Sequence, residues 1–404
     1  MRRFAPILAA AVLAGCASAP AEHAAQGAKP VAKDRNAAWA DSRARAPLAV
    51  TVAFDRRGRL WRAEVQEGRI WLGRVDDLAS PRLAVNATPE AIAADGENRP
   101  KLAFGRDGEI YVSWTVSGSA PFTGDVRFAR SLDGGAHFDS PITVNDDRAA
   151  VSHRFDSLVV DGGGRIHLLW LDQREAQARK LAGGAYAGIS LYTAVSANRG
   201  ASFGANRKLA DHSCECCRIA TALDPDGTPV ALWRGVFGKN ERDHALLRLD
   251  GRSTARRASF DRWAVEACPH HGPALAIGDD GIWHLAWWTG GDNGGLFYAR
   301  SRDCGASFSA PQPIGARAAQ AGRAALYAHD RLVWRAWKEF DGTSTLLRVQ
   351  ESPDGGAHFG TARTVSQSTS ASDHPQLAGF HDDVRLSWYS AAEGHRVFAL
   401  GGAP

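Results

Sequence analysis

A short apolar strand, a turn rich in Gly and Asp, and a second apolar strand ending near tryptophan recur along this chain. Clear copies are KLAFGRDGEIYVSW, SLVVDGGGRIHLLW, ATALDPDGTPVALW and ALAIGDDGIWHLAW. The tryptophans of the second strands, with those of two shorter copies, are Trp114, Trp170, Trp233, Trp287, Trp337 and Trp388. They follow one another at intervals of 50 to 63 residues, and a diverged first copy starts at Ala49. One four-stranded β-propeller blade has this length, so the pattern predicts a ring of repeated blades.

A second motif, Ser-x-Asp/Asn-x-Gly-x-x-Phe, begins at Ser131, Ser196, Ser301 and Ser352. Its acidic or amide side chain can hydrogen-bond nearby backbone, and its glycine supplies a positive φ, as a tight turn requires. The motif resembles the Asp-box of bacterial sialidases and their relatives. That resemblance implies hairpin turns of propeller blades on the side away from the active site, and no catalytic role for the motif itself.

Both motifs predict an all-β fold, a β-propeller of four-stranded antiparallel blades spanning residues 46–404. Seven units are counted, whereas sialidases have six, so six blades is the alternative. The Asp-boxes fall between the third and fourth strands of units two, three, five and six. The last unit lacks an outer strand, which residues 38–42 are expected to supply because closure removes free sheet edges.

The N-terminus predicts export. Residues 1–15 have a basic start and a short apolar run, as in a secretory signal peptide. Leu13-Ala14-Gly15-Cys16 resembles a bacterial lipobox, which implies cleavage before Cys16 and its lipidation. An ordinary signal peptide with a chance cysteine is the alternative. Residues 16–45 then form an alanine-rich tether, and we expect a monomeric outer-membrane lipoprotein that faces the periplasm or the cell surface and contacts the membrane through its lipid.

Composition adds little to this picture. Hydrophobic residues make up 44% of the chain and charged residues 23%, with a formal net charge of +4, as in soluble globular proteins. No basic run stands out, so nucleic acid is not an expected partner.

Polar residues gather just before the first strand of each blade, where ligands of propellers usually sit over the channel. Arg99, Arg218, Arg323 and His374 share one aligned position; Asn98, Arg154, Cys217 and His271 share the position before it. Several cations around one opening predict a small anionic ligand such as a carboxylate or phosphate. The alternative is that the arginines join neighbouring blades through carbonyls and aspartates.

The sialidase resemblance also implies catalytic candidates. Cys217-Arg218-Ile219-Ala220 resembles the family's Arg-Ile-Pro segment, although it lacks the proline and lies in mid-chain. Tyr389, before a serine, resembles the late nucleophilic tyrosine. Asp172 and Glu175, in the long loop after the second strand of unit three, are the carboxylate candidates for hydrolysis of an acidic sugar.

The most specific local chemistry lies in two clusters, HSCECCRIA and ACPHHGPA. They contain Cys214, Cys216 and Cys217, and Cys268, His270 and His271. The alignment places them at the same end of neighbouring blades four and five. Converging thiolates and imidazoles are ligands for copper(I) or zinc(II). The combination CxCC with a later CP-x-x-G is similar to one in a subgroup of bacterial sialidase-like lipoproteins.

Disulfides are the alternative, because an exported protein meets oxidising conditions. Cys268 can then pair with any of the first three cysteines, and adjacent Cys216 and Cys217 would be strained as a pair. Cys304, inside an Asp-box, is expected to be unrelated to the site. The leading hypothesis is therefore a cell-envelope lipoprotein that binds a metal or a small anionic ligand over blades three to five. A sialidase-type glycoside hydrolase and a protein-interaction scaffold are the alternatives.

Overall fold

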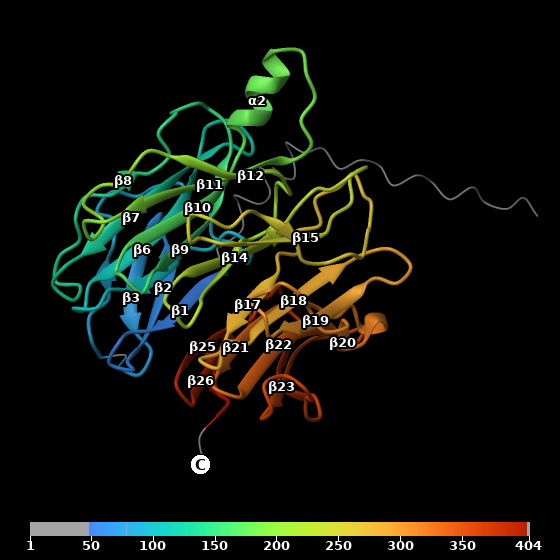
Figure 1. Cartoon of the computed structure of the whole chain (residues 1–404). Helices are drawn as coiled ribbons and strands as arrows, with labels where there is room; N and C mark the ends of the chain where they lie inside the picture. Colours follow the sequence, from blue (N-terminus) through green and yellow to red (C-terminus); the bar gives the residue numbers. More distant parts are fainter. Residues whose placement is uncertain (1–47, 78, 402–404) are drawn as a thin grey trace, which may run out of the picture. The chain divides into compact units, whose positions relative to one another are not determined.

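The computed structural model describes residues 48–77 and 79–401, which belong to one compact unit. These residues form seven antiparallel sheets, six of four strands and a last one of three. The protein is thus a seven-bladed β-propeller (Figure 1), which confirms the predicted fold and seven blades rather than six. The expected signal peptide, lipidated Cys16, tether and closing segment 38–42 lie outside the described residues. Among the described residues, no helix has the length and apolar character needed to cross a membrane.

Each blade is built from strands that follow one another in sequence, with the first strand innermost. Blade 1 contains β1 (Val50–Phe54), β2 (Leu60–Gln66), β3 (Arg69–Arg74) and β4 (Leu83–Ala84). Blade 2 contains β5 (Lys101–Phe104), β6 (Ile110–Ser117), β7 (Gly124–Ser131) and β8 (Ile142–Thr143). Blade 3 contains β9 (His153–Val160), β10 (Ile166–Asp172), β11 (Ile189–Ser196) and β12 (Arg207–Ser213). Blade 4 contains β13 (Ala220–Leu223), β14 (Pro229–Arg234), β15 (His244–Arg248) and β16 (Arg256–Arg257).

The remaining blades follow the same order. Blade 5 contains β17 (Ala274–Ile277), β18 (Trp283–Thr289), β19 (Gly295–Ser301) and β20 (Gln312–Ile314). Blade 6 contains β21 (Gly322–His329), β22 (Leu332–Phe340), β23 (Thr345–Ser352) and β24 (Arg363–Ser368). Blade 7 contains β25 (Gln376–Phe380), β26 (Asp383–Ser390) and β27 (Gly394–Ala399). Helix α2 (Arg174–Leu181) lies in the loop between β10 and β11, and the 3-10 helix η1 (Arg317–Ala319) lies between β20 and β21.

The seven inner strands form a closed circle. Each contacts the inner strands of both neighbouring blades, and β1 contacts β25; β17, β21 and β25 lie side by side in Figure 1. The backbone N–H of Val50 donates to Asp373 at 3.3 Å, and that of Val52 donates to the Gln376 side chain at 2.8 Å. The first and last blades are thus joined directly through their inner strands.

The repeated tryptophans of the second strands form the core between blades. Trp114, Trp170 and Trp337 are fully buried, and Trp170 pairs across β10 and β11 with Tyr192. The indole N–H of Trp170 donates to Asp172 at 2.8 Å, so the polar atom of this ring is also satisfied. Truncating such a side chain to alanine typically costs about 3–5 kcal/mol, which explains why each blade keeps one.

The Asp-boxes form the turns between the third and fourth strands, as predicted. In the first box, the buried Ser131 hydroxyl donates to Asp133 at 2.7 Å and accepts from the Gly135 N–H at 2.8 Å. Gly135 has a φ of +102°, and a Cβ there would lie 2.4 Å from a Leu83 methyl carbon of the preceding blade. The box therefore requires glycine for both backbone conformation and packing between blades.

Candidate functional site

A buried carboxylate, Glu97, organises the mouth of the channel. It precedes β5, is 3% exposed, and accepts hydrogen bonds from the Arg218 guanidinium at 2.9 Å and the Arg323 guanidinium at 3.1 Å. The backbone N–H groups of Arg218 and Gly272 donate to its other oxygen at 2.9 and 2.8 Å. One side chain of blade 2 therefore holds the starts of the inner strands of blades 4, 5 and 6.

The sequence-predicted cations do gather here, but most of their donors are used within the protein. Arg99 pairs with buried Asp373 at 2.9 Å and donates to the carbonyls of Val50 and His374. Arg218 also donates to the carbonyls of Pro273 and Ala324. The alternative considered above, in which arginines join blades, thus describes Arg99 and Arg218 well.

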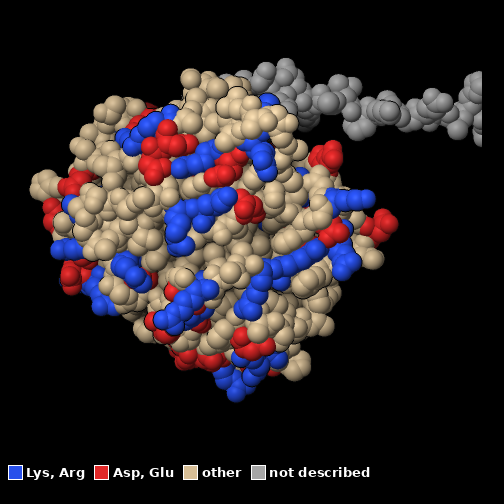
Figure 2. Space-filling model, turned by 45° about the horizontal axis from the view of Figure 1, so that its top comes forward, with Lys and Arg blue, Asp and Glu red and all other residues tan. Residues whose placement is uncertain are grey.

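A hollow of about 190 Å³ remains between these groups. Its charged and titratable lining residues are Glu97, Arg99, Lys101, Arg218 and His374. Nδ1 of His374 is buried without a hydrogen-bond partner, 3.4 Å from Glu97, and burial holds the pKa of this ring well below its usual value. Cations outnumber carboxylates in the hollow. The face of the molecule drawn in Figure 2 carries both basic and acidic side chains.

Local backbone irregularities direct two of the arginines. Phe155 in β9 and Arg323 in β21 have φ values of +58° and +61°, beside shifts in strand register. Such bulges change the direction in which neighbouring side chains point. Arg154 lies over the Phe155 ring at 5.0 Å, and its Nε is buried without a hydrogen-bond partner.

Three cysteine sulfurs meet beside the mouth, between blades 3 and 4. Cys214, Cys216 and Cys217 belong to the turn between β12 and β13 and are 1%, 3% and 1% exposed. Their Sγ atoms are 3.9, 3.9 and 4.0 Å apart, far beyond a disulfide bond of about 2.05 Å. The five cysteines of the described part are all free thiols in this structure. An apolar wall that includes Leu169 and Trp233 surrounds the three sulfurs, so water has little access to them.

The three thiols share their hydrogen bonds unequally. Hydrogen bonds with Cys216 and Cys217, aided by the positive charges of Arg234 and Arg242, hold the pKa of Cys214 well below its usual value. The same hydrogen bonds raise the pKa of Cys216, and burial raises that of Cys217. The surroundings therefore favour ionisation of Cys214 over that of its two neighbours.

The second predicted cluster lies at the same end of the ring. The thiol of Cys268 is exposed and near enough to Cys216 for the two thiols to shift each other's pKa. His271 stacks on Trp288 at 4.4 Å, and burial lowers its pKa to about 2. The sulfur atoms of the three buried cysteines all lie within 4.8 Å of one another. Neither His270 nor His271 belongs to this group. Arg234 connects the two clusters, because it donates to the His271 carbonyl and its charge acts on Cys214.

The glycosidase candidates have other partners. Asp172 is fully buried and accepts from Trp170 and from Arg174, and Glu175 accepts from Tyr192 at 2.7 Å. Tyr389 lies in blade 7, where its ring stacks on His395 at 6.5 Å. No hydrogen bond or ion pair among the described residues joins Tyr389 to either carboxylate.

A further group combines Asp172 with Asp147 and His153. His153 Nε2 lies 2.8 Å from Asp147 and 3.9 Å from Asp172, and its Nδ1 hydrogen-bonds with the Gly124 carbonyl. The carboxylate of Asp172 is already neutralised by Arg174, so this group is a weaker candidate for a cation than the cysteines.

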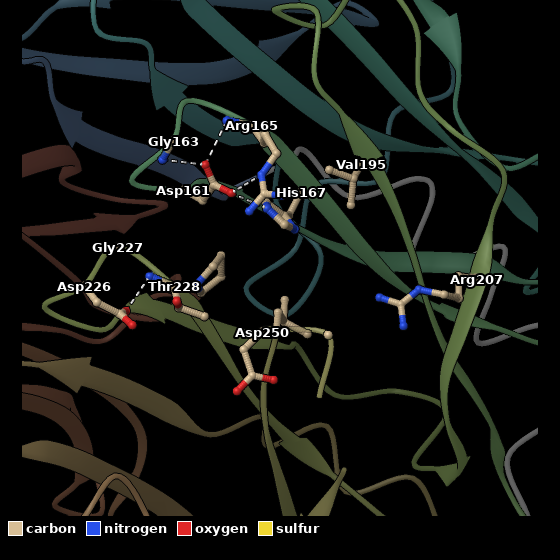
Figure 3. A pocket seen from close by; sticks show the side chains of 13 residues that line it. Asp161, Gly163, Arg165, His167, Val195, Arg207, Asp226, Gly227, Thr228 and Asp250 are labelled. Atoms are coloured by element: carbon tan, nitrogen blue, oxygen red, sulfur yellow. Dashed lines mark hydrogen bonds and ion pairs between the residues drawn. The ribbon is translucent and has the colours of Figure 1, made fainter. Parts of the chain in front are cut away.

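A larger hollow, of about 470 Å³, lies between the turns of blades 3 and 4 (Figure 3). It contains no sequence-predicted site residue. Asp161 in its wall is occupied by Arg165 and by the ring of His167 at 2.9 Å. These turns join first and second strands, at the end of the blades opposite the starts of the inner strands.

Comparisons with known proteins agree on the fold. No known family profile and no curated protein matches the sequence. An ulvan lyase of family PL25, bound to -[GlcA(1-4)Rha3S]-, has a TM-score of 0.57 at 11% identity, over 88% of this chain and 93% of its own. The intramolecular trans-sialidase of Ruminococcus gnavus, in complex with oseltamivir carboxylate, has 0.54 at 11% identity, over 82% and 100%. NanB sialidase of Streptococcus pneumoniae has 0.51 at 12% identity, over 80% and 71%.

At such identities the likeness shows the fold alone. The chain is a propeller of a type that sialidases and ulvan lyases, which are carbohydrate-active enzymes, also use.

Sequence reasoning missed Glu97, although it identified the two residues that follow it. The available signal was position, because Glu97 immediately precedes the aligned pair Asn98 and Arg99. It also missed Asp373, the partner of Arg99, which directly precedes the aligned His374.

Proposed function

We propose that this protein binds a thiophilic metal ion, copper(I) or zinc(II), through Cys214, Cys216 and Cys217 in the bacterial cell envelope. The observation that carries the proposal is the nearly equilateral arrangement of three buried sulfurs, 3.9 to 4.0 Å apart. Sulfurs about 2.3 Å from one ion are separated by about 3.8 Å at tetrahedral angles and by about 4.0 Å at trigonal angles.

The chemistry of the donors supports the same conclusion. Thiolates are soft ligands that select copper(I) and zinc(II) over magnesium or calcium. An apolar wall keeps water and competing ligands away, and the lowered pKa of Cys214 favours its ionisation. Binding then displaces the remaining thiol protons. The envelope location rests on the lipobox-like segment at Cys16.

The test is metal analysis of the full chain, purified without chelators under anaerobic conditions. We expect about one copper or zinc ion per chain. Cys217→Ser should lose the ion, whereas Cys304→Ser, which changes an exposed cysteine in an Asp-box, should keep it. Metal-free protein in which mass spectrometry finds a disulfide to Cys268 would overturn the proposal.

Binding of an acidic sugar over the channel is the second candidate function. It is favoured by the surplus of cations in the hollow beside Glu97. The PL25 lyase was solved bound to a glucuronate-containing saccharide, and the trans-sialidase with a carboxylate inhibitor. Arg323 does not line the hollow itself, but its only ion pair in the described part is with Glu97, which does, so Arg323 is the arginine we propose to turn toward a bound carboxylate.

Isothermal titration with glucuronate and with sialic acid would test this candidate. Arg323→Ala should abolish binding, whereas Arg302→Ala, on the opposite Asp-box face, should leave it intact. If the protein hydrolyses a fluorogenic sialoside and the Tyr389→Phe variant does not, the function extends to that of a glycosidase. If the protein shows neither sugar binding nor sialoside hydrolysis, the scaffold hypothesis remains. Retention of a specific envelope protein by the immobilised chain would support that hypothesis.

A further inference from the structure

Three arginines whose charges act on the cysteines form no ion pair with a carboxylate in the described part of the chain. Arg234 is 1% exposed and donates to the carbonyls of Arg242, His271 and Trp288. Arg242 donates to a carbonyl, and Arg154 lies over a phenylalanine ring. Arg154, Arg234 and Arg242 form no ion pair among the residues that the structure describes. Of the three only Arg234 is buried; a buried guanidinium without a counter-charge is strongly unfavourable, so Arg234 favours negative charge nearby.

The thiolates can supply that charge, alongside two carboxylates that interact electrostatically at longer range, Asp95 with Arg154 and Asp261 with Arg234. The electrostatic influence of Arg234 reaches Cys214 and Cys217, that of Arg242 reaches Cys214 and Cys268, and Arg154 interacts with Cys216. Three thiolates around a monovalent ion retain two net negative charges, whereas around a divalent ion they retain one. The arginines therefore favour the monovalent ion.

The number of buried donors leads to the same choice. Structural zinc sites are almost always closed by four protein ligands in a tetrahedron. The buried group here has three, and its sulfur separations match a planar, three-coordinate arrangement as well as a tetrahedral one. Copper(I) accepts three thiolates without a fourth ligand.

Cys268 differs from the other three in its exposure. Its thiol is open to solvent, yet it is near enough to the buried Cys216 for the two thiols to shift each other's pKa. Because Cys214, Cys216 and Cys217 are at most 3% exposed, an ion reaching them from solvent needs an intermediate ligand. Cys268 is the one thiol among the described cysteines that is open to solvent and also interacts with the buried group.

We infer that the site is selective for copper(I), held by the three buried sulfurs, and that Cys268 is the exposed thiol through which the ion is taken up and released. This inference rests on the proposed function. Transfer proceeds by exchange of one copper–sulfur bond for another, with no change in oxidation state, so no oxidant or reductant is involved. The donor and acceptor would be small thiols or Cys- or Met-rich envelope proteins, which share the soft sulfur ligands copper(I) prefers.

Selectivity is tested on the full chain by anaerobic titration with copper(I) against bicinchoninic acid, and with zinc(II) against a colorimetric chelator. We expect copper(I) to bind at least about a hundredfold more tightly than zinc(II). X-ray absorption should find three sulfurs around copper. A zinc ion with four sulfurs, bound at least as tightly as copper(I), would overturn the inference while leaving the proposed function intact. Failure of both ions to bind would contradict the proposed function itself.

The arginine contribution has its own matched pair of variants. Arg242→Gln should weaken copper(I) binding about tenfold and zinc(II) binding less, because the copper-loaded site carries more negative charge. Arg256→Gln, in which an exposed arginine of the same blade is changed, should alter neither. An equal loss for both ions would contradict the electrostatic argument.

The role of Cys268 is separated from that of a resident ligand by kinetics. Cys268→Ser should keep the copper(I) affinity within about threefold, while slowing transfer to excess bicinchoninic acid about tenfold or more, since exposed thiolates govern ligand exchange. Cys304→Ser, which removes the other exposed thiol, should leave both quantities unchanged. Affinity lost in Cys268→Ser, or transfer at the wild-type rate, would overturn this part of the inference.

Discussion

Replacing Glu97 by glutamine should destabilise the whole ring, because this one carboxylate is shared by several blades. Its oxygens receive two guanidinium groups and two backbone N–H groups, from Arg218, Gly272 and Arg323. Glutamine keeps the shape but removes the charge and turns an NH₂ group toward donors. The side chains of Arg218 and Arg323 are 19% and 24% exposed, so water replaces the lost partner only in part.

Breaking a buried ion pair from one side typically costs about 3–5 kcal/mol, and an orphaned buried N–H about 1–3 kcal/mol. Since these contributions overlap and the arginines retain some solvent, we expect Glu97→Gln to lower the free energy of unfolding by about 4 kcal/mol. Urea unfolding followed by tryptophan fluorescence measures this change as a shift in midpoint at constant slope.

The matched control is Asp76→Asn, which breaks a pair with Arg74 on a carboxylate that is 53% exposed. That change should cost at most about 0.5 kcal/mol. A loss below about 1 kcal/mol in Glu97→Gln would refute the reasoning. It would mean that Arg218 and Arg323 do not depend on Glu97 and are available to an anionic ligand.

Two further predictions concern the ring. Ser131→Ala, which removes the acceptor of the buried Gly135 N–H, should cost about 1–2 kcal/mol, and an unchanged urea midpoint would contradict the role given to the Asp-box. Burial lowers the pKa of Lys338 to about 8, whereas the unfolded chain binds this proton up to about pH 10.5. Between about pH 8 and pH 10.5 the unfolded state therefore binds more protons than the folded state, and the free energy of unfolding should rise with pH over this range. This rise should be larger in the wild type than in Lys338→Met. Parallel pH curves for the two proteins would show that Lys338 is not desolvated.

The fold was predictable because its signals are local and repeated. Each tryptophan strand carries its own alternation, and each Asp-box carries its own turn, so seven weak patterns reinforce one another. The convergence of Cys216 and Cys268 was also within reach, because both precede inner strands of neighbouring blades. Ring topology alone determines which sequence-distant residues are neighbours at the channel.

Partners of individual side chains were not predictable in the same way. The alignment placed Arg99 and Arg218 at the mouth, but nothing in their positions showed that Asp373 and Glu97 would occupy them. Likewise, nothing in the position of Arg234 after Trp233 showed that it would donate to backbone carbonyls of blades 4 and 5 and form no ion pair. Which side chains pair depends on differences of a few ångströms in how neighbouring blades pack. A sequence pattern does not predict such small differences.

We propose that Cys214, Cys216 and Cys217 hold one thiophilic metal ion. Anomalous diffraction from crystals of the full chain, collected above and below the copper and zinc absorption edges, tests this proposal most directly. We expect one anomalous peak at about 2.3 Å from all three sulfurs. A sulfur–sulfur bond within the group, or a peak bound to other residues while these three thiols stay unligated, would contradict it.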